Sequence, residues 1–381
     1  MGEEQHNLSQ RLTETRTLAN LSQSQLAKKL GVSTSLISHW EKGTRTPSSS
    51  QLSELARNMG VALDYLLNAE IRPDFFKCRA KVKSEQREEI DQTLRDASSQ
   101  VHFVATAYRL AQKLPKPFAL WADFGSMDAL PSVAVHLRDT LKLNRRVTLD
   151  ELKQALADWN VFVFEWDMPR HLSGISLRGA FSVIFVNHLH PPTRRLFTLA
   201  HEFAHVVFHL GREVEGGKME TQVSITSTRD PIEKQANAFA GELLMPRSAL
   251  EKLIKDYKDQ LREPAMLDAA ARHFNVSRDA LFYRLAQLDF FSWTDKSSYL
   301  NPGSFPLEDA PPLRVADARG IDTQVDARFR DTALTLYQDG KVTTGKLAEW
   351  FFTPRHLVDE YLDELAKKKD DSIPGDANGE G

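Results

Sequence analysis

The 381-residue sequence predicts an α+β protein with an all-α N-terminal domain, a mainly helical middle domain that holds a small antiparallel sheet, and a C-terminal helical region. Three observations predict this class. Residues 1–70 contain short amphipathic segments separated by single turn residues, which is typical of a helix-turn-helix domain. Residues 161–166 and 181–187 are apolar runs rich in Val and Phe, which indicate strands. Apolar residues at helical spacing dominate the remainder.

The composition excludes several classes of protein. A net charge of −3 does not fit a protein that is basic as a whole, so any affinity for nucleic acid must be local. Cys78 is the single cysteine, which excludes an intramolecular disulfide and a thiolate zinc cluster. The sequence has no apolar run of about 18 residues and begins with polar residues, so we expect a cytoplasmic protein without a membrane partner.

A helix-turn-helix unit is predicted near the N-terminus. Ser22 is placed to cap a helix over residues 23–30, Gly31 supplies the turn, and Ser33 caps a helix that runs to residue 42. The expected core consists of Leu26, Ala27, Leu30, Val32, Ile37 and Trp40. Residues 5–58 contain seven Lys or Arg and three acidic residues, and this excess of four basic side chains favours local attraction to DNA.

The same stretch resembles the Cro/CI-type (XRE) DNA-binding domains. The resemblance is carried by Leu-Ser-Gln-x-x-Leu-Ala-x-x-Leu-Gly-Val-Ser at residues 21–33 and by Ile-Ser-x-Trp-Glu-x-Gly at residues 37–43. It implies that the partner is an operator in double-stranded DNA. In the docking mode of that family, the residues facing base edges would be Thr34, Ser35, Ser38 and His39, and those holding phosphates would be Gln23, Lys42 and Arg45. The alternative is a helical bundle that contacts other proteins.

Residues 85–113 predict one long helix, which follows an irregular segment at residues 71–83. Its apolar positions repeat at four-three spacing and form a narrow stripe of Ile90, Leu94, Ala97, Val101, Val104, Tyr108 and Ala111. Such a stripe can pair two chains, which would give a homodimer, or it can pack along the middle domain. The sequence leaves both possibilities open.

The motif His-Glu-Phe-Ala-His at residues 201–205 lies in an apolar, helix-forming run. Side chains four residues apart project from the same helix face, so His201 and His205 can bind one zinc ion. Glu202 is the next residue round the helix, where it can act as the general base for an attacking water. His209 is rotated by about 80° from His201, which favours a surface or supporting role.

A second helix is predicted to follow, and it offers Glu233 and Glu242 as a third, carboxylate ligand. The motif above, together with Glu-x-x-Ala-Asn-x-Phe-Ala-x-x-Leu-Leu-Met-Pro at residues 233–246, resembles the ImmA/IrrE family of zinc metallopeptidases. By this resemblance His201, His205 and Glu233 would bind Zn²⁺, and Glu202 would be the catalytic base. Glu242 would then be a carboxylate on the helix surface.

The resemblance also implies a function. It suggests a bacterial or phage-borne regulator whose zinc endopeptidase domain cleaves a repressor protein in a stress or mobile-element response. The strand over residues 182–186 would bind substrate by strand addition, and the polar residues 211–230 would form a mobile loop over the cleft. The alternative is a transcription factor or antitoxin whose peptidase-like domain senses a ligand or partner and cleaves nothing.

These inferences divide the chain into five parts. They are a DNA-binding domain at residues 1–70, a connector with the long helix at 71–115, a metallopeptidase domain at 116–298, a helical region at 299–366, and a disordered tail at 367–381. The C-terminal helical region is rich in acidic side chains, which favours protein contact or dimerisation over DNA binding: Asp331, Asp359, Glu360, Asp363 and Glu364.

Overall fold

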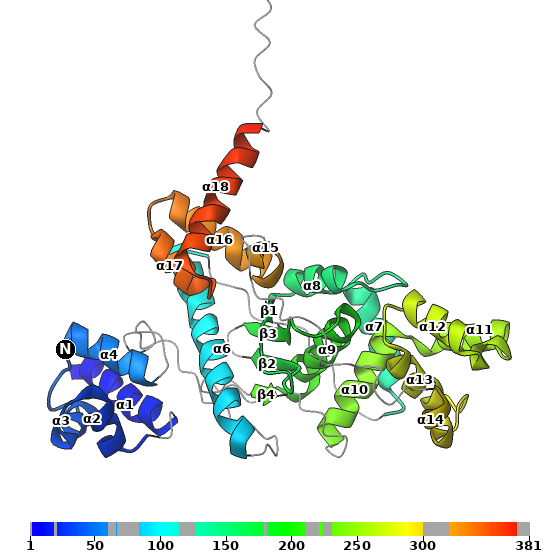
Figure 1. Ribbon diagram of the computed structural model, residues 1–381, viewed down its shortest axis with the longest axis horizontal. Helices are drawn as coiled ribbons and strands as arrows, with labels where there is room; N and C mark the ends of the chain where they lie inside the picture. Colours follow the sequence, from blue (N-terminus) through cyan, green and yellow to red (C-terminus); the bar gives the residue numbers. More distant parts are fainter. Residues whose placement is uncertain are drawn as a thin grey trace, which may run out of the picture.

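The computed structural model describes residues 2–18, 21–59, 66, 84–113, 127–178, 181–210, 221–223, 231–299 and 320–371. Their buried apolar side chains form three cores, one among the N-terminal helices and one on each face of a four-stranded sheet. In Figure 1 the N-terminal helices lie on one side of the long helix α6 (Ser84–Leu110), and the sheet lies on its other side. Within these ranges, none of the helices combines the length and the hydropathy of a bilayer-spanning segment.

Four helices make up the N-terminal part: α1 (Gly2–Leu18), α2 (Gln23–Leu30), α3 (Thr34–Glu41) and α4 (Ser49–Met59). A capping box starts α2, because the Ser22 hydroxyl accepts from the Gln25 amide and the Gln25 side chain accepts from the Ser22 amide. Gly31 has a φ of 65°, which glycine adopts without strain, and Ser33 caps α3. The predicted helix-turn-helix is therefore confirmed.

The sheet contains the strands β1 (Val161–Trp166), β2 (Gly174–Arg178), β3 (Ser182–Asn187) and β4 (Thr221–Val223). Their spatial order is β1-β3-β2-β4, and β2 pairs in antiparallel fashion with both β3 and β4. By contrast, β1 and β3 are parallel, with Val163 opposite Ile184. The sheet is therefore mixed, and the prediction of an antiparallel sheet is wrong in this respect.

The physical reason lies in the connection between β1 and β2. Residues 167–173 carry the chain past one strand position, and β3 then returns into the gap between β1 and β2. The alternation of side chains along a strand specifies which face is buried, but it does not specify the neighbouring strand. Because β3 is paired on both sides, the prediction that residues 182–186 offer an open edge to substrate is also wrong.

The sheet is the middle layer of the molecule. Val163 and Ile184 point into a core shared with α8 (Leu149–Asp158), α9 (Pro192–Ala204) and α10 (Pro231–Leu244). Phe164 and Phe185, the next residues along the same strands, point into the core shared with α6. Successive residues of a strand face opposite sides, so apolar runs without polar interruption produce a sheet that is buried on both faces.

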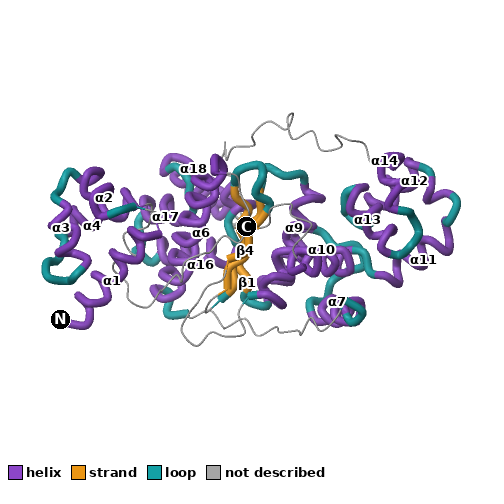
Figure 2. The backbone as a smooth tube through the Cα atoms, turned by 90° about the horizontal axis from the view of Figure 1, so that it is seen from below, coloured by secondary structure: helices purple, strands orange, loops and turns teal. Residues whose placement is uncertain are grey.

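More helices extend the face that carries α9 and α10. They are α7 (Leu130–Thr140), α11 (Arg247–Tyr257), α12 (Pro264–His273), α13 (Arg278–Gln287) and the short α14 (Lys296–Tyr299). Figure 2 shows α11 to α14 grouped at the end of the molecule, with α10 between them and the sheet. The helix α10 therefore joins the sheet layer to the helical extension.

The apolar stripe of α6 packs within the chain. Its members Ile90, Ala97 and Val104 are at most 1% exposed, and they share a core with the sheet and with α16 (Ala327–Gln338). Of the two roles that the sequence left open, the structure shows packing along the middle domain. The irregular segment predicted at residues 71–83 lies outside the described residues.

The C-terminal helices complete this second face: α15 (Gly320–Gln324), α16, α17 (Thr344–Trp350) and α18 (Arg355–Asp371). They also cover the outer edge of β1, because the Val163 amide donates to Asp326 Oδ2 at 3.0 Å and Arg328 donates to the Val161 carbonyl at 2.8 Å. Since α18 continues to Asp371, the expectation of disorder from residue 367 onward is wrong for its first five residues. Residues 372–381 lie outside the described part of the chain.

Candidate metal centre and DNA-binding surface

The predicted motif lies on α9, which is buried between β3 and α10. Pro192 occupies the first turn of α9, where its missing N–H costs no hydrogen bond. After Ala204 the helix widens into a π-helical turn over His205–His209, in which the Leu210 amide bonds to the His205 carbonyl at 2.9 Å. Such π-helical turns are rare in proteins, and those that do occur are often found at functional sites.

Three side chains converge where α9 meets α10. The Nε2 atoms of His201 and His205 lie 3.1 Å apart, and the Glu233 oxygens lie 3.1 Å from His201 Nε2 and 3.5 Å from His205 Nε2. All three residues are buried. Ligand atoms at about 2.1 Å from one ion in a tetrahedral arrangement are roughly 3.4 Å apart. The cluster therefore has the donor atoms and the spacing that fit a divalent metal ion.

The protonation of the two imidazoles differs. Burial first, and then the neighbouring imidazoles of His201 and His209, lower the pKa of His205 well below its usual value, so its ring is neutral. Burial also lowers the pKa of His201, but the hydrogen bond that His201 donates to Glu233 and the charges of Glu202 and Glu233 outweigh it, and the net shift is upward. Only a neutral imidazole binds a metal, so a metal ion and a proton compete for His201.

Asn237 of α10 and His209 of the π-helical turn contact the two imidazoles from behind. His201 Nδ1 lies 3.0 Å from Asn237 Oδ1, and His205 Nδ1 lies 2.9 Å from His209 Nδ1. His209 Nε2 in turn lies 3.1 Å from Gln235 Oε1. The supporting role expected for His209 is what the contacts show. Sequence reasoning did not single out Asn237 or Gln235, although Asn237 lies four residues after Glu233 and so on the same helix face.

Glu202 is fully buried and lies against the start of β2. A Cβ atom built on Gly174 would be 2.8 Å from Glu202 Cγ, 2.9 Å from Glu202 Oε1 and 2.7 Å from Thr198 Cγ2. These distances are shorter than real contacts of a Cβ atom, so glycine is needed for this close approach. Gly174 thus makes room for the carboxylate beside the cluster.

Glu242 does not contribute to the cluster. It lies nine residues after Glu233, about 180° round the helix at 100° per residue, and therefore faces the other way. The prediction that it is a surface carboxylate is wrong, because Glu242 is 2% exposed and forms an ion pair with Arg284 of α13. It also accepts a hydrogen bond from the Arg247 amide at 2.7 Å. Glu242 therefore joins α10 to the start of α11 and to α13.

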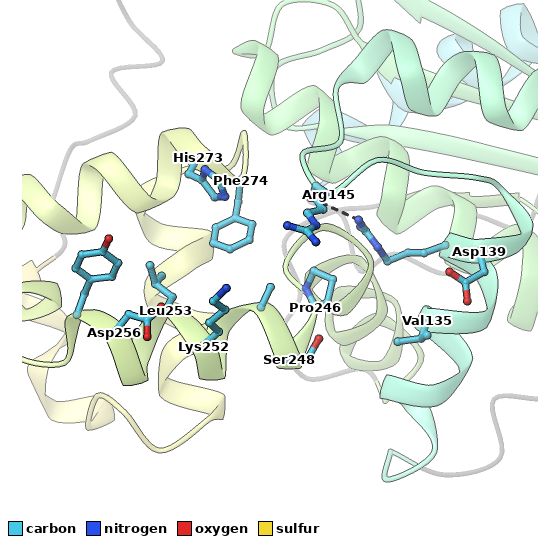
Figure 3. A pocket seen from close by; sticks show the side chains of 13 residues that line it. Val135, Asp139, Arg145, Pro246, Ser248, Lys252, Leu253, Asp256, His273 and Phe274 are labelled. Atoms are coloured by element: carbon cyan, nitrogen blue, oxygen red, sulfur yellow. Dashed lines mark hydrogen bonds between the residues drawn. The ribbon is translucent and has the colours of Figure 1, made fainter.

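A pocket of about 520 Å³ lies beyond α10, between α7, α11 and α12. Figure 3 shows Lys252 on one side of it and Arg145 and Phe274 on the other. Acidic side chains, Asp139 and Asp256, also line this pocket, and the three residues of the cluster do not. The pocket is therefore separate from the candidate metal centre, and its mixed charges indicate no particular class of ligand.

The residues predicted to contact DNA lie on or beside α3. Thr34, Ser35 and His39 are exposed and Ser38 is half-buried, while Lys42 and Arg45 are exposed just after the helix. The ring of His39 is held by Thr44, whose hydroxyl lies 2.9 Å from His39 Nδ1. These positions leave the residues accessible to a ligand, and their roles in DNA binding stay predictions.

Gln23 is engaged within the domain. Its side-chain nitrogen donates to Glu41 Oε2 at 2.7 Å, and Arg16 makes two hydrogen bonds to the same carboxylate at 2.5 and 3.0 Å. This network joins α1, α2 and α3. The phosphate contact predicted for Gln23 would therefore have to use the other amide hydrogen or the amide oxygen.

Two family models match parts of this chain. Residues 12–66 match the model of the helix-turn-helix family, and residues 160–286 match the model of the IrrE N-terminal-like domain, peptidase M78. No curated protein matched the chain. Among solved structures, the apo form of ComR from S. thermophilus aligns at 14% identity over 91% of this chain and 99% of that chain, with a TM-score of 0.16. The chain thus joins an XRE-type helix-turn-helix domain to an IrrE-like domain of the M78 peptidase family.

Proposed function

We propose that this protein is a DNA-binding transcriptional regulator with a zinc-dependent endopeptidase centre at His201, His205 and Glu233. The observation that carries the proposal is the convergence of three buried donor groups, with nitrogen and oxygen atoms 3.1 to 3.5 Å apart. Buried polar and charged groups are stable only when paired, and a metal ion would pair with all three at once. Such a regulator works where its DNA is, in the cytoplasm.

The chain's own residues would divide the chemistry among them. A bound zinc ion would supply a Lewis acid that polarises the scissile carbonyl and lowers the pKa of water. Neutral His205 keeps a lone pair that could bind the metal, while Asn237 and His209 orient the two rings. Glu202, packed against Gly174, takes the proton from the attacking water and passes it to the leaving amine.

The helix-turn-helix domain would bring the peptidase to an operator. Thr34, Ser35, Ser38 and His39 are proposed to reach base edges, and Gln23, Lys42 and Arg45 are proposed to bind phosphates. The substrate that the family resemblance supports is a repressor protein, cleaved when a stress or mobile-element signal arrives. The likeness of the N-terminal domain to repressors supports this choice, because a shared operator would place enzyme and substrate together.

A second candidate function is favoured by the position of β4. The start of β2 lies beside Glu202, and the outer edge of β2 is paired with β4, with Ile175 opposite Val223. A substrate strand added at that edge would have to replace β4. The second candidate is therefore a regulator that senses a ligand or partner through its metal domain without cleaving it. The variant Glu202→Gln separates the two, because only a peptidase loses its regulatory output with this base.

Metal content is the first measurement. Elemental analysis of the purified full-length protein is expected to find about one zinc per chain, lost in His201→Ala and in Glu233→Ala. His273→Ala is the matched control, because His273 is an exposed histidine of α12 outside the cluster. A wild-type protein that takes up no zinc on titration would contradict the proposed centre.

Cleavage is tested next, by mass spectrometry of co-expressed helix-turn-helix repressors in the presence of the wild type or Glu202→Gln. Fragments that form with the wild type alone support the peptidase. Equal regulation by both proteins with no fragments from either would favour the second candidate.

A further inference from the structure

A continuous chain of hydrogen bonds runs from the inward face of His205 to α10. His205 Nδ1 lies 2.9 Å from His209 Nδ1, and His209 Nε2 lies 3.1 Å from the side-chain oxygen of Gln235. At the other end, His205 Nε2 faces His201 and Glu233. His205 is fully buried, and His209 and Gln235 are half-buried, so these contacts are partly shielded from bulk water.

The acceptor at the end of this series of hydrogen bonds, the side-chain oxygen of Gln235, determines which nitrogen carries the hydrogen in each imidazole. An amide oxygen can only accept, so His209 Nε2 must carry the hydrogen. A neutral imidazole carries one hydrogen, which leaves His209 Nδ1 as an acceptor, and therefore His205 Nδ1 must be the donor. His205 Nε2 is then left with a lone pair, directed at the cluster. The opposite order would place a hydrogen on His205 Nε2, where it would block a metal ion.

We infer that Gln235 is a positioning residue of the candidate metal centre, which acts through His209 to hold His205 in the tautomer that can bind a metal ion. The inference rests on the proposed function in one respect, since it takes the cluster to be a metal site. It assigns a role to the π-helical turn, whose last residue is His209. It also gives α10 three tasks, because Glu233 provides a ligand, Asn237 supports His201 and Gln235 supports His205.

The affinity of the full-length protein for zinc, measured by competition with a chelator, tests the inference. Loss of a partner behind a metal-binding histidine typically weakens affinity about 10- to 100-fold, and we expect this for Gln235→Met. Lys234→Met is the matched control, because Lys234 is the exposed neighbour on the same helix and should leave the affinity unchanged. Equal affinity of Gln235→Met and the wild type would overturn the inference.

A double-mutant cycle tests whether Gln235 acts through His209. His209→Phe removes the middle of the chain, so it should weaken zinc binding by itself and leave nothing for Gln235→Met to remove. The double variant is therefore expected to bind zinc as His209→Phe does. If the two losses multiply instead, the residues act separately and the proposed chain is wrong.

A readout that needs no metal separates this inference from the proposed function. In zinc-free protein with ¹⁵N-labelled histidine, long-range ¹H–¹⁵N correlations should show His205 protonated at Nδ1 and His209 at Nε2. In Gln235→Met, His209 should populate both tautomers, and His205 should follow it. The same tautomers in both proteins would refute the inference. A wild type with the expected tautomers but no affinity for zinc would refute the metal centre alone.

Discussion

At the scale of single residues, the candidate centre depends on the absence of a side chain as well as on its three donor residues. Gly174 is an example, because its missing side chain is what allows β2 to approach Glu202 and Thr198. Spacing along α9 predicts that His201 and His205 share a face, and the structure shows them in contact. Nothing in the sequence pattern predicts Gly174, because it comes next to Glu202 only through the packing of a strand on a helix.

The variant Gly174→Ala tests this close approach. Its Cβ would lie under 3 Å from three atoms, and such overpacking typically costs about 1–3 kcal/mol of unfolding free energy. We expect a lower midpoint in urea and a displaced Glu202, with zinc content retained. Gly345→Ala in α17 is the control, since its Cβ would meet its nearest atom at an ordinary 3.7 Å. A loss of stability no greater than that of the control would contradict this prediction, because it would show that the neighbouring side chains can move away from the new Cβ atom without destabilising the fold.

At the scale of elements, one buried carboxylate ties α9 to the sheet. Glu165 of β1 forms ion pairs with Arg195 of α9 and with Lys153 of α8, the latter at 2.9 Å. Burial raises the pKa of Glu165, but the hydrogen bond with His188 and the charges of Lys153 and Arg195 outweigh it and hold this pKa at about 2. Helix α9 is thus anchored at its first half by the ion pair of Arg195 and at its second half by packing against α10.

The lowered pKa of Glu165 predicts a pH-dependent stability. The carboxylate stabilises the fold fully above its unfolded pKa of about 4.3, and this contribution disappears as the pH falls toward 2. The difference in unfolding free energy between wild type and Glu165→Gln should therefore shrink by about 3 kcal/mol between pH 6 and pH 2. Glu251→Gln is the control, because Glu251 pairs with Arg247 while both side chains are more than half exposed. A difference that is constant with pH would contradict the ion-pair account.

At the scale of the whole molecule, segments far apart in sequence cover one face of the sheet. Helix α6 and the helices α15 to α18 share a core with Phe162 and Phe164, although residues 113 and 320 flank the whole of the peptidase-like domain. Asp326 and Arg328 close the edge of β1. The acidic C-terminal helices, for which we predicted a role in protein contacts, thus have an internal role in the fold.

The helix-turn-helix domain predicts a DNA affinity that depends on local charge, because the whole chain is acidic. Removing one phosphate contact with Arg45→Ala should weaken binding to duplex DNA and reduce the slope of log affinity against log salt by about 1. Fluorescence anisotropy over a range of salt concentrations measures both. Arg355→Ala in α18 makes the same change of net charge away from the N-terminal domain and should alter neither. An unchanged slope for Arg45→Ala would show that Arg45 does not contact a DNA phosphate.

The parts that were predictable from sequence are those in which neighbours along the chain determine the outcome. Ser22, Gly31 and Ser33 place the turn of the helix-turn-helix by local hydrogen bonds and backbone freedom. Helical spacing likewise places His201 beside His205. By contrast, the choice between Glu233 and Glu242 came from the family resemblance, since both lie on one helix and only its rotation toward α9 separates them.

The sequence by itself determined the classes of element and the character of their faces. Periodicity of 3.6 or 2 residues is a local property, and it assigned the helices, the strands β1 and β3 and the stripe of α6. It missed β4, which lies in the stretch predicted as a mobile loop at residues 211–230 and pairs with β2. The tertiary structure decided which surfaces meet: β1 beside β3, α6 against the C-terminal helices, and Asn237 and Gln235 behind the imidazoles. The physical reason is that contacts between distant segments depend on connection geometry and packing, for which a local hydrophobic pattern carries no information.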